Sequence, residues 1–273
     1  MAQHRTLVGR AAASVSVASL FLVTAASAQW RTLPDHEWCR EQGDRDRGWH
    51  CEVREMTMAA PGHLEIDAGP NGGIAVTGSS RADVHVIARF TAWADSDQRA
   101  RELVAETRID VDGGALDSDG PERDRDESWS VSYRVATPRS VDLSVETTNG
   151  GIGISDVAGD IEFRTTNGGV TLVGLAGDVG GRTTNGSLTV ELTGSEWTGD
   201  GMDVRTTNGA VRLLVPDGYS AHLAARTTNG GLHFDFPITV QGRLDRNIEL
   251  DLGQGGRPIS VRTTNGGVHV ARP

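Results

Sequence analysis

One pentapeptide dominates the second half of the chain and limits what the chain can fold into. Arg-Thr-Thr-Asn-Gly occurs at 164–168, 182–186, 205–209, 226–230 and 262–266, and a variant beginning with Glu occupies 146–150. Successive asparagines are 18, 18, 23, 21 and 36 residues apart. Spacing of this size is typical of a solenoid, in which each repeat packs on the next. Because the last interval is twice 18, we expect one coil there to have lost the pentapeptide, and the last copy to form the terminal coil.

Side-chain alternation along a strand assigns the pentapeptide to two faces. Phe163, Thr165 and Asn167 share one parity, and Arg164 and Thr166 share the other. The apolar members of the first set must face the core. We therefore expect the first Thr and the Asn of every copy to point inward, and the Arg and the second Thr to point outward.

An inward asparagine needs a hydrogen-bond partner, because an unsatisfied buried amide costs roughly 1–3 kcal/mol. Stacked identical coils supply one, since each amide can donate to the matching Asn or to a backbone carbonyl about 4.8 Å away. The glycine that follows permits the positive φ of a sharp corner. The predicted structural ladder consists of Asn149, Asn167, Asn185, Asn208, Asn229 and Asn265.

The same pattern leaves a second fold open. Asn-Gly between alternating strands is also a strong signal for a type I′ hairpin. An antiparallel array, however, does not require the same Thr-Thr-Asn in every copy. The repeat therefore favours an all-β protein, a parallel β-solenoid (β-helix) with about 18–23 residues per coil over residues 141–273.

The start of the chain has the features of an export signal. Residues 1–28 combine a positive beginning, a short apolar core and a small-residue cleavage pattern, which predicts a signal peptide and a mature chain from Gln29. No later segment approaches the length of a transmembrane helix. The formal net charge is −11, and removal of Arg5 and Arg10 leaves 24 basic against 37 acidic residues, which argues against nucleic acid as a partner. We expect an exported protein of the periplasm, cell surface or extracellular space.

Residues 29–60 form a charged segment that contains both cysteines. In an exported protein, Cys39 and Cys51 predict a disulfide that ties an N-terminal cap. A zinc site is the alternative, because His36 and His50 stand beside the two cysteines.

Residues 61–140 combine a degenerate repeat with other elements. Alternating runs around Pro70-Asn71-Gly72-Gly73 predict an early copy of the coil. One short helix is expected over Asp95–Glu106, with Asp95 or Ser96 as its cap. Strands are expected at 108–111 and 129–135, on either side of an acidic hairpin tip at Asp117–Glu127, for which calcium binding is a weaker alternative.

The T-T-N-G-G-[IV]-x-[VIL] coils, together with the export signal and the strands before a short helix, resemble a known bacterial family. It is the β-strand-repeat family named “putative adhesin”, a domain of unknown function similar in style to the heads of autotransporter adhesins. The resemblance runs from about Pro61 to the end of the chain. It implies a β-helical protein of the cell envelope and transfers no catalytic residue.

No catalytic motif, metal-binding motif or cofactor-binding motif emerges from the sequence, and the acidic residues are scattered over predicted turns. We expect a non-enzymatic protein for adhesion, scaffolding or ligand binding. A carbohydrate-active β-helix enzyme, a polysaccharide lyase or hydrolase, is the alternative, which carboxylates clustered in one groove would favour.

The candidate ligands are an acidic glycan, an envelope lipid headgroup or another envelope protein. The candidate binding residues form the outward column Arg164, Arg182, Arg205, Arg226, Arg262, Thr166, Thr184, Thr207, Thr228 and Thr264.

Overall fold

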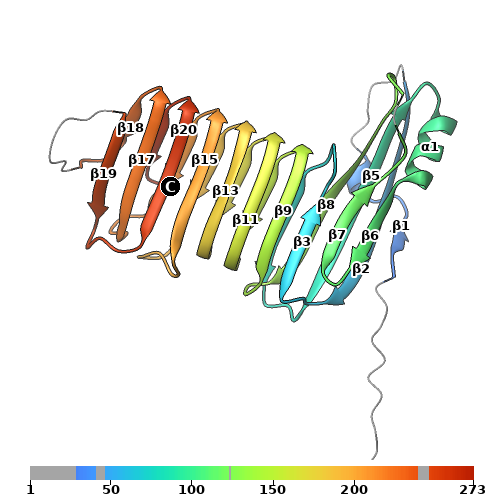
Figure 1. Cartoon of the computed structure of the whole chain (residues 1–273). Helices are drawn as coiled ribbons and strands as arrows, with labels where there is room; N and C mark the ends of the chain where they lie inside the picture. The colour runs from blue at the N-terminus through green and yellow to red at the C-terminus, as the bar shows by residue number, and fades with distance from the viewer. Residues whose placement is uncertain (1–28, 41–46, 123, 239–245) are drawn as a thin grey trace, which may run out of the picture.

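Two stacked β-sheets make up nearly all of the described structure (Figure 1). The structure is a computed structural model that describes residues 29–40, 47–122, 124–238 and 246–273, so the predicted signal peptide lies outside the described residues. Among these residues the first sheet has 11 strands and the second has 10. One continuous apolar core lies between the two sheets.

Each copy of the repeat contributes one strand to each sheet. In the second sheet the strand ends on the asparagine, and after the corner a shorter strand enters the first sheet. Neighbouring copies pair in parallel and in register, as in Asn149 with Asn167 and Asn167 with Asn185, which confirms the prediction of an all-β protein with parallel coils. The second-sheet strands of the copies are β9 (Asp142–Asn149), β11 (Ala158–Asn167), β13 (Ala176–Asn185), β15 (Gly201–Asn208), β17 (Ala221–Asn229) and β20 (Pro258–Asn265). Their first-sheet strands are β10 (Ile152–Ser155), β12 (Val170–Val173), β14 (Leu188–Glu191), β16 (Val211–Leu214), β18 (Leu232–Phe234) and β21 (Val268–Ala271).

The degenerate repeat forms the first coil of the stack. Its strands β3 (His63–Asp67) and β4 (Ile74–Ser79) pair in parallel with β9 and β10. Asn71 lies opposite Asn149 at the corner. The Pro-Asn-Gly-Gly corner therefore occupies the place that Thr-Asn-Gly-Gly takes in the later coils.

The N-terminal end of the stack is antiparallel. Strands β1 (Arg31–Leu33), β2 (Gly48–Ala59), β5 (Asp83–Ala94) and β8 (Ser128–Pro138) continue the first sheet beyond β4. β2 pairs with β5 along its whole length. The sequence did not predict β2, because the segment it occupies shows little alternation of polar and apolar residues.

A hairpin ends the second sheet on the same side. It consists of β6 (Arg108–Asp112) and β7 (Ala115–Asp119), and β7 pairs in parallel with β3. The prediction of an acidic hairpin tip over Asp117–Glu127 is therefore wrong for its first residues, Asp117–Asp119, which belong to β7. Leu116 and Ser118 are buried while Asp117 is exposed, so the residues alternate as a strand despite their charge.

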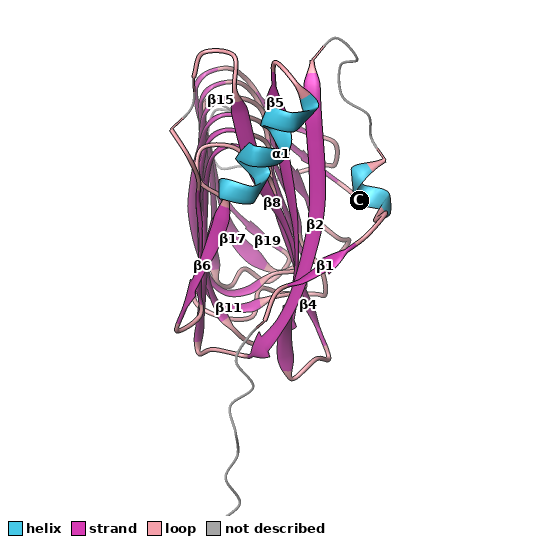
Figure 2. Cartoon of the chain, turned by 90° about the vertical axis from the view of Figure 1, so that its right-hand side faces the viewer, coloured by secondary structure: helices cyan, strands magenta, loops and turns pink. Residues whose placement is uncertain are grey.

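The helix α1 (Asp97–Glu106) covers the N-terminal end of the stack (Figure 2). Ser96 caps it by accepting a hydrogen bond from the Arg99 N–H. The apolar stripe of Ala100, Leu103 and Val104 is buried, and the helix packs on β2 and β5. It closes the core at a place where a further coil would otherwise have to stack.

Cys39 and Cys51 form the predicted disulfide, with their Cα atoms 5.7 Å apart. The bridge ties the 3-10 helix η1 (Glu37–Cys39) to β2 and occupies both sulfur atoms, so the zinc alternative is excluded. Trp38 lies between the guanidinium groups of Arg89 and Arg134, at 4.9 and 4.0 Å from the ring centroid. The segment is thereby fixed to the outer face of the first sheet.

Reduction of this disulfide is expected to destabilise the N-terminal end by about 3 kcal/mol, the chain-entropy value for a loop of this size. The check is thermal unfolding of the wild-type chain and of the Cys39→Ser/Cys51→Ser variant, each with and without reductant. Reductant should lower the unfolding temperature of the wild-type chain and leave that of the variant unchanged. An unfolding temperature of the wild-type chain that does not change with reductant would contradict the expectation.

The last copy of the repeat is inserted out of chain order. β20 lies between β15 and β17 in the second sheet, and β21 lies between β16 and β18 in the first (Figure 1). The expectations that the 36-residue interval hides a coil and that the last copy ends the stack are both wrong. The interval contains β19 (Asn247–Leu252), which runs antiparallel along β17 and returns the chain to the edge at which β17 begins. From there β20 enters the gap in the same direction as its neighbours.

Candidate functional site

The first threonine of each copy points into the core and is hydrogen-bonded there. Its hydroxyl donates to the carbonyl oxygen of the corner glycine in the neighbouring coil, as in Thr165 to Gly150 at 3.0 Å and Thr183 to Gly168 at 2.9 Å. This partner satisfies a polar group that would otherwise be costly to bury. The buried members are Thr147, Thr165, Thr183, Thr206, Thr227 and Thr263.

The asparagines form a continuous ladder, but they do not point inward as the alternation predicts. Each amide donates to the side-chain oxygen of the next asparagine in space, as in Asn167 to Asn149 at 2.7 Å and Asn265 to Asn208 at 2.7 Å. Asn71 of the first coil extends the ladder. All of the ladder asparagines from Asn149 onward are exposed, because the strand ends at this residue and the alternation stops at the corner.

The corner glycine is needed for a different reason from the one expected. Of the six, only Gly266 has a φ in the left-handed region, 156°. A Cβ on Gly168 would instead lie 1.8 Å from the carbonyl oxygen of Gly150, and a Cβ on Gly186 would lie 1.9 Å from that of Gly168. The corners of adjacent coils therefore approach so closely that only glycine fits.

The arginines and second threonines form a column on the outer face of the second sheet. In space the arginines follow the order Arg164, Arg182, Arg205, Arg262, Arg226. All are exposed except Arg262, which is half-buried. Beside them Thr166, Thr207, Thr228 and Thr264 are exposed and Thr184 is half-buried.

The arginine column is only partly neutralised. Arg262 forms an ion pair with Asp203, and Arg164 lies 3.7 Å from Glu146, the residue that replaces Arg in the variant copy. Within the described part of the chain, Arg182 and Arg205 have no ion-pair partner. These two guanidinium groups lie between the two neutralised ones and are free to bind an anion.

A groove of about 320 Å³ lies beside these two arginines. It is hollowed at Gly180, where an added Cβ would meet nothing within 4 Å. On the inner side of the same strand, Gly181 leaves room for the ring of Phe163. β13 therefore lacks a side chain at two successive positions. In the row of Gly180, Glu162 and Asp203 form the two walls.

Four carboxylates and three guanidinium groups line this groove. The carboxylates belong to Asp160, Glu162, Asp178 and Asp203, and the guanidinium groups to Arg164, Arg182 and Arg205. The expectation that the acidic residues are scattered over turns is therefore wrong for these four, which lie on paired strands. The sequence signal that could have revealed them is the common register of the 18-residue copies, together with Gly180. Such a surface can accept hydrogen bonds from hydroxyl groups and donate them to an anion.

The geometry defines a class of protein, a two-sheet β-solenoid with a polar groove on its outer face. The chain belongs to the Toastrack DUF4097 family, whose model matches residues 127–271. This membership confirms the resemblance based on the TTNG coils, although the match begins later than Pro61. None of the curated proteins matches the chain.

Several solved structures match much of the chain at low similarity. A “putative cell adhesion protein” from Clostridium sporogenes is 8% identical with a TM-score of 0.41, over 81% of this chain and 100% of that one. A “putative adhesin” from Bacteroides fragilis is 11% identical with a TM-score of 0.39, over 81% and 97%. A “putative lipid binding protein” from Parabacteroides distasonis is 9% identical with a TM-score of 0.26, over 81% and 96%.

Among the described residues no helix has the length and apolar character required to cross a bilayer.

Proposed function

We propose that this protein is an exported, non-enzymatic β-solenoid that binds an acidic glycan in the groove beside Arg182 and Arg205. The observation that carries the proposal is the pair of guanidinium groups without ion-pair partners in the described structure, next to the gap at Gly180. The disulfide between Cys39 and Cys51 and the predicted signal peptide support export, because disulfides persist in oxidising compartments.

The two guanidinium groups without ion-pair partners favour an anionic group beside them, in a groove that four carboxylates and three guanidinium groups leave close to neutral overall. Arg182 and Arg205 are direct neighbours in register, and two such charges about 4.8 Å apart repel by roughly 1 kcal/mol in water. The neighbours on either side, Arg164 and Arg262, already have acidic partners. A carboxylate or sulfate from outside would relieve the remaining repulsion and accept paired hydrogen bonds from the planar guanidinium forks.

The rest of the groove favours a sugar over a simple anion. Glu162 and Asp178 are exposed and have no ion-pair partner in the described structure, so their oxygens can accept hydrogen bonds from hydroxyl groups. A polymer of acidic sugars offers both kinds of group at once. The open row of coils also suits an extended chain. Binding to a lipid headgroup is the competing outcome that the experiment distinguishes.

The carboxylate cluster supports a second candidate function, that of a carbohydrate-active enzyme. Asp160, Glu162, Asp178 and Asp203 lie in one groove, the feature that hydrolases and lyases require. All four are exposed, however, whereas a general acid of this chemistry is normally set in an apolar pocket. We therefore place binding ahead of turnover.

The Arg182→Ala/Arg205→Ala variant is expected to bind polygalacturonate about 10-fold or more weakly, because each charge-assisted hydrogen bond contributes roughly 1.5–3 kcal/mol. Arg226→Ala is the matched control, since Arg226 is exposed in the same column but lies outside the groove. The measurement is titration calorimetry at low and high salt, and wild-type binding should weaken with salt.

Two further ligands and an activity assay complete this experiment. Neutral dextran should not bind. Anionic lipid vesicles that bind in preference to polygalacturonate, with loss in the double variant, would move the assignment to a lipid. Release of unsaturated or reducing ends from polygalacturonate, abolished by Glu162→Gln, would replace binding by catalysis. Equal binding by the double variant and the wild type would refute the proposal that the groove binds the glycan.

A further inference from the structure

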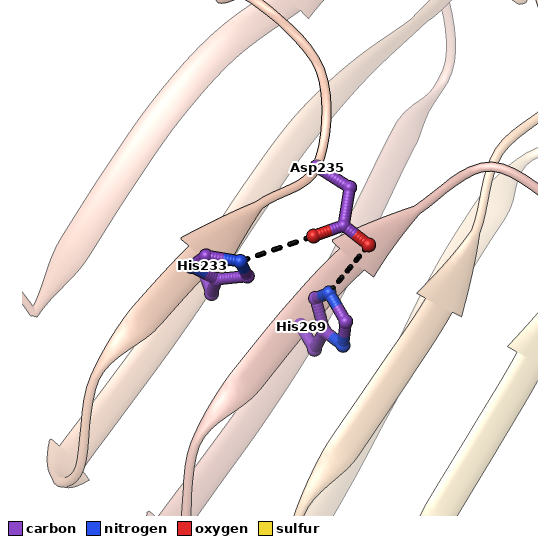
Figure 3. Close-up of side chains that lie close together, drawn as sticks. All are labelled: His233, Asp235 and His269. Atoms are coloured by element: carbon purple, nitrogen blue, oxygen red, sulfur yellow. Dashed lines mark ion pairs between the residues drawn. The ribbon is translucent and has the colours of Figure 1, made fainter.

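A second cluster of side chains lies on the outer face of the first sheet, far along the stack from the N-terminal cap. It consists of His233, Asp235 and His269 (Figure 3). His233 and His269 are direct partners in the parallel pair β18 and β21. Asp235 follows β18 immediately, and its N–H donates to the carbonyl oxygen of Val270 at 3.0 Å. All three positions are therefore fixed by sheet backbone.

The ligand atoms of the three side chains converge. His233 Nε2 lies 3.0 Å from Asp235 Oδ1, and His269 Nε2 lies 2.8 Å from Asp235 Oδ2. The two imidazole rings are 5.0 Å apart between centroids. All three ligand atoms lie within 4.8 Å of one another. Ligand atoms on a tetrahedral zinc ion lie about 3.3 Å apart, since each is about 2.0–2.1 Å from the metal, so small rotations of exposed side chains suffice.

A simple ion-pair cluster leaves one atom unexplained. The Nε2 atom of His269 is buried and, within the described residues, makes no hydrogen bond of good geometry despite its short distance to Asp235. A cation between the three groups would use the lone pair of His269 Nε2 and the negative charge of Asp235 together.

We propose that His233, Asp235 and His269 bind a divalent transition-metal ion, with Zn²⁺ as the best match. Two imidazole nitrogens and one carboxylate oxygen are ligands that zinc takes readily, whereas Ca²⁺ and Mg²⁺ prefer oxygen ligands alone. Three protein ligands leave at least one coordination position for water or for a group from outside. The neighbouring row position beyond His269 is Arg212, which is exposed.

The site depends on the direct pairing of the last two copies of the repeat. His233 and His269 are 36 residues apart in the sequence and become neighbours because β18 and β21 pair with no coil between them. A stack in chain order with an extra coil between them would separate the two histidines by two strand spacings. Because such a coil was expected in the 36-residue interval, these two histidines did not form a recognisable metal-binding motif in the sequence.

The test is titration of the full chain, purified without a histidine tag and freed of metal by a chelator, with ZnCl₂ in a calorimeter. One equivalent should bind, and Zn²⁺ should raise the melting temperature because it binds only the folded chain. His233→Ala and His269→Ala should each weaken this binding by at least ~10-fold, since loss of even an outer-sphere partner typically costs this much. CaCl₂ should give no comparable heat.

His222→Ala is the matched control. His222 also contacts a carboxylate, Asp251, at 2.8 Å, but it has no second histidine beside it. Its variant should bind Zn²⁺ like the wild type. Absence of Zn²⁺ binding in the wild type, unchanged binding in both His233→Ala and His269→Ala, or an equal loss in His222→Ala would overturn the proposal. The outcome is independent of glycan binding, because the cluster lies on the opposite sheet from the groove.

Discussion

Replacing Gly168 by alanine is expected to destabilise the protein by about 2–3 kcal/mol or more, as overpacking of a rigid site does. The added Cβ would lie 1.8 Å from the carbonyl oxygen of Gly150, and the paired strands β9 and β11 hold the backbone on both sides of this contact in place. The buried hydroxyl of Thr183 donates to the carbonyl oxygen of Gly168, so displacement of this corner would also weaken the hydrogen bond in the next coil. Thermal unfolding should show a melting temperature lower by roughly 5–10 °C.

The adjacent glycine provides the control for this substitution. A Cβ on Gly169 would lie 3.6 Å from its nearest neighbour, the carbonyl oxygen of Ser187, which is an ordinary contact. Other copies already carry Ser187 and Ala210 at the equivalent position. Gly169→Ala should therefore change stability by no more than ~0.5 kcal/mol. Equal effects of the two substitutions would show that the corners do not approach as the structure describes.

Removal of residues 257–273 is expected to unfold the C-terminal end of the stack while leaving the earlier coils intact. The deletion takes away β20 and β21, so β17 and β18 lose their parallel partners and the core loses Ile259, Val261 and Val270. In a solenoid each coil contacts only its neighbours, so the loss should not spread far. Hydrogen exchange should become fast over 221–234 and 247–252 and stay slow over 141–190.

A peptide of residues 257–273, added back to the truncated chain, should restore slow exchange over 221–234 and 247–252. The same peptide with Val261→Asp should not, because it would place a charge in the core beside Val204 and Ala225. Persistent protection of these two ranges without any peptide would mean that β17 closes directly on β15 and that the inserted coil is dispensable.

The pattern of the pentapeptide predicted much of the fold, and its failures have identifiable causes. Alternation correctly placed Thr165 inside and Arg164 outside, because both lie within a regular strand. It failed at Asn167, since alternation does not hold where a strand ends. The role of Gly168 was misjudged for a related reason: a close approach between two corners is a property of stacked coils and leaves no trace in a single copy.

The candidate sites were harder to predict than the fold. The outward arginines follow from the repeat, but the groove depends on the absence of a side chain at Gly180 and on carboxylates from three neighbouring strands. The histidine cluster was not predicted, because the 36-residue interval was interpreted as containing an additional coil. Without that coil the two histidines, each four residues after the asparagine of its copy, are direct partners.

The order of the coils is the central claim about the fold, because the last copy of the repeat lies between β15 and β17 in the second sheet and between β16 and β18 in the first. Two double-cysteine variants test it directly by oxidative cross-linking, followed by mass spectrometry of the linked peptides. Arg205 and Arg262 are partners in register, so Arg205→Cys/Arg262→Cys should bridge, with Cα atoms about 4.8 Å apart. Arg205 and Arg226 are separated by β20, roughly twice that distance, and Arg205→Cys/Arg226→Cys should not bridge. Cross-linking of 205 to 226, with none of 205 to 262, would show a stack in chain order and contradict the account.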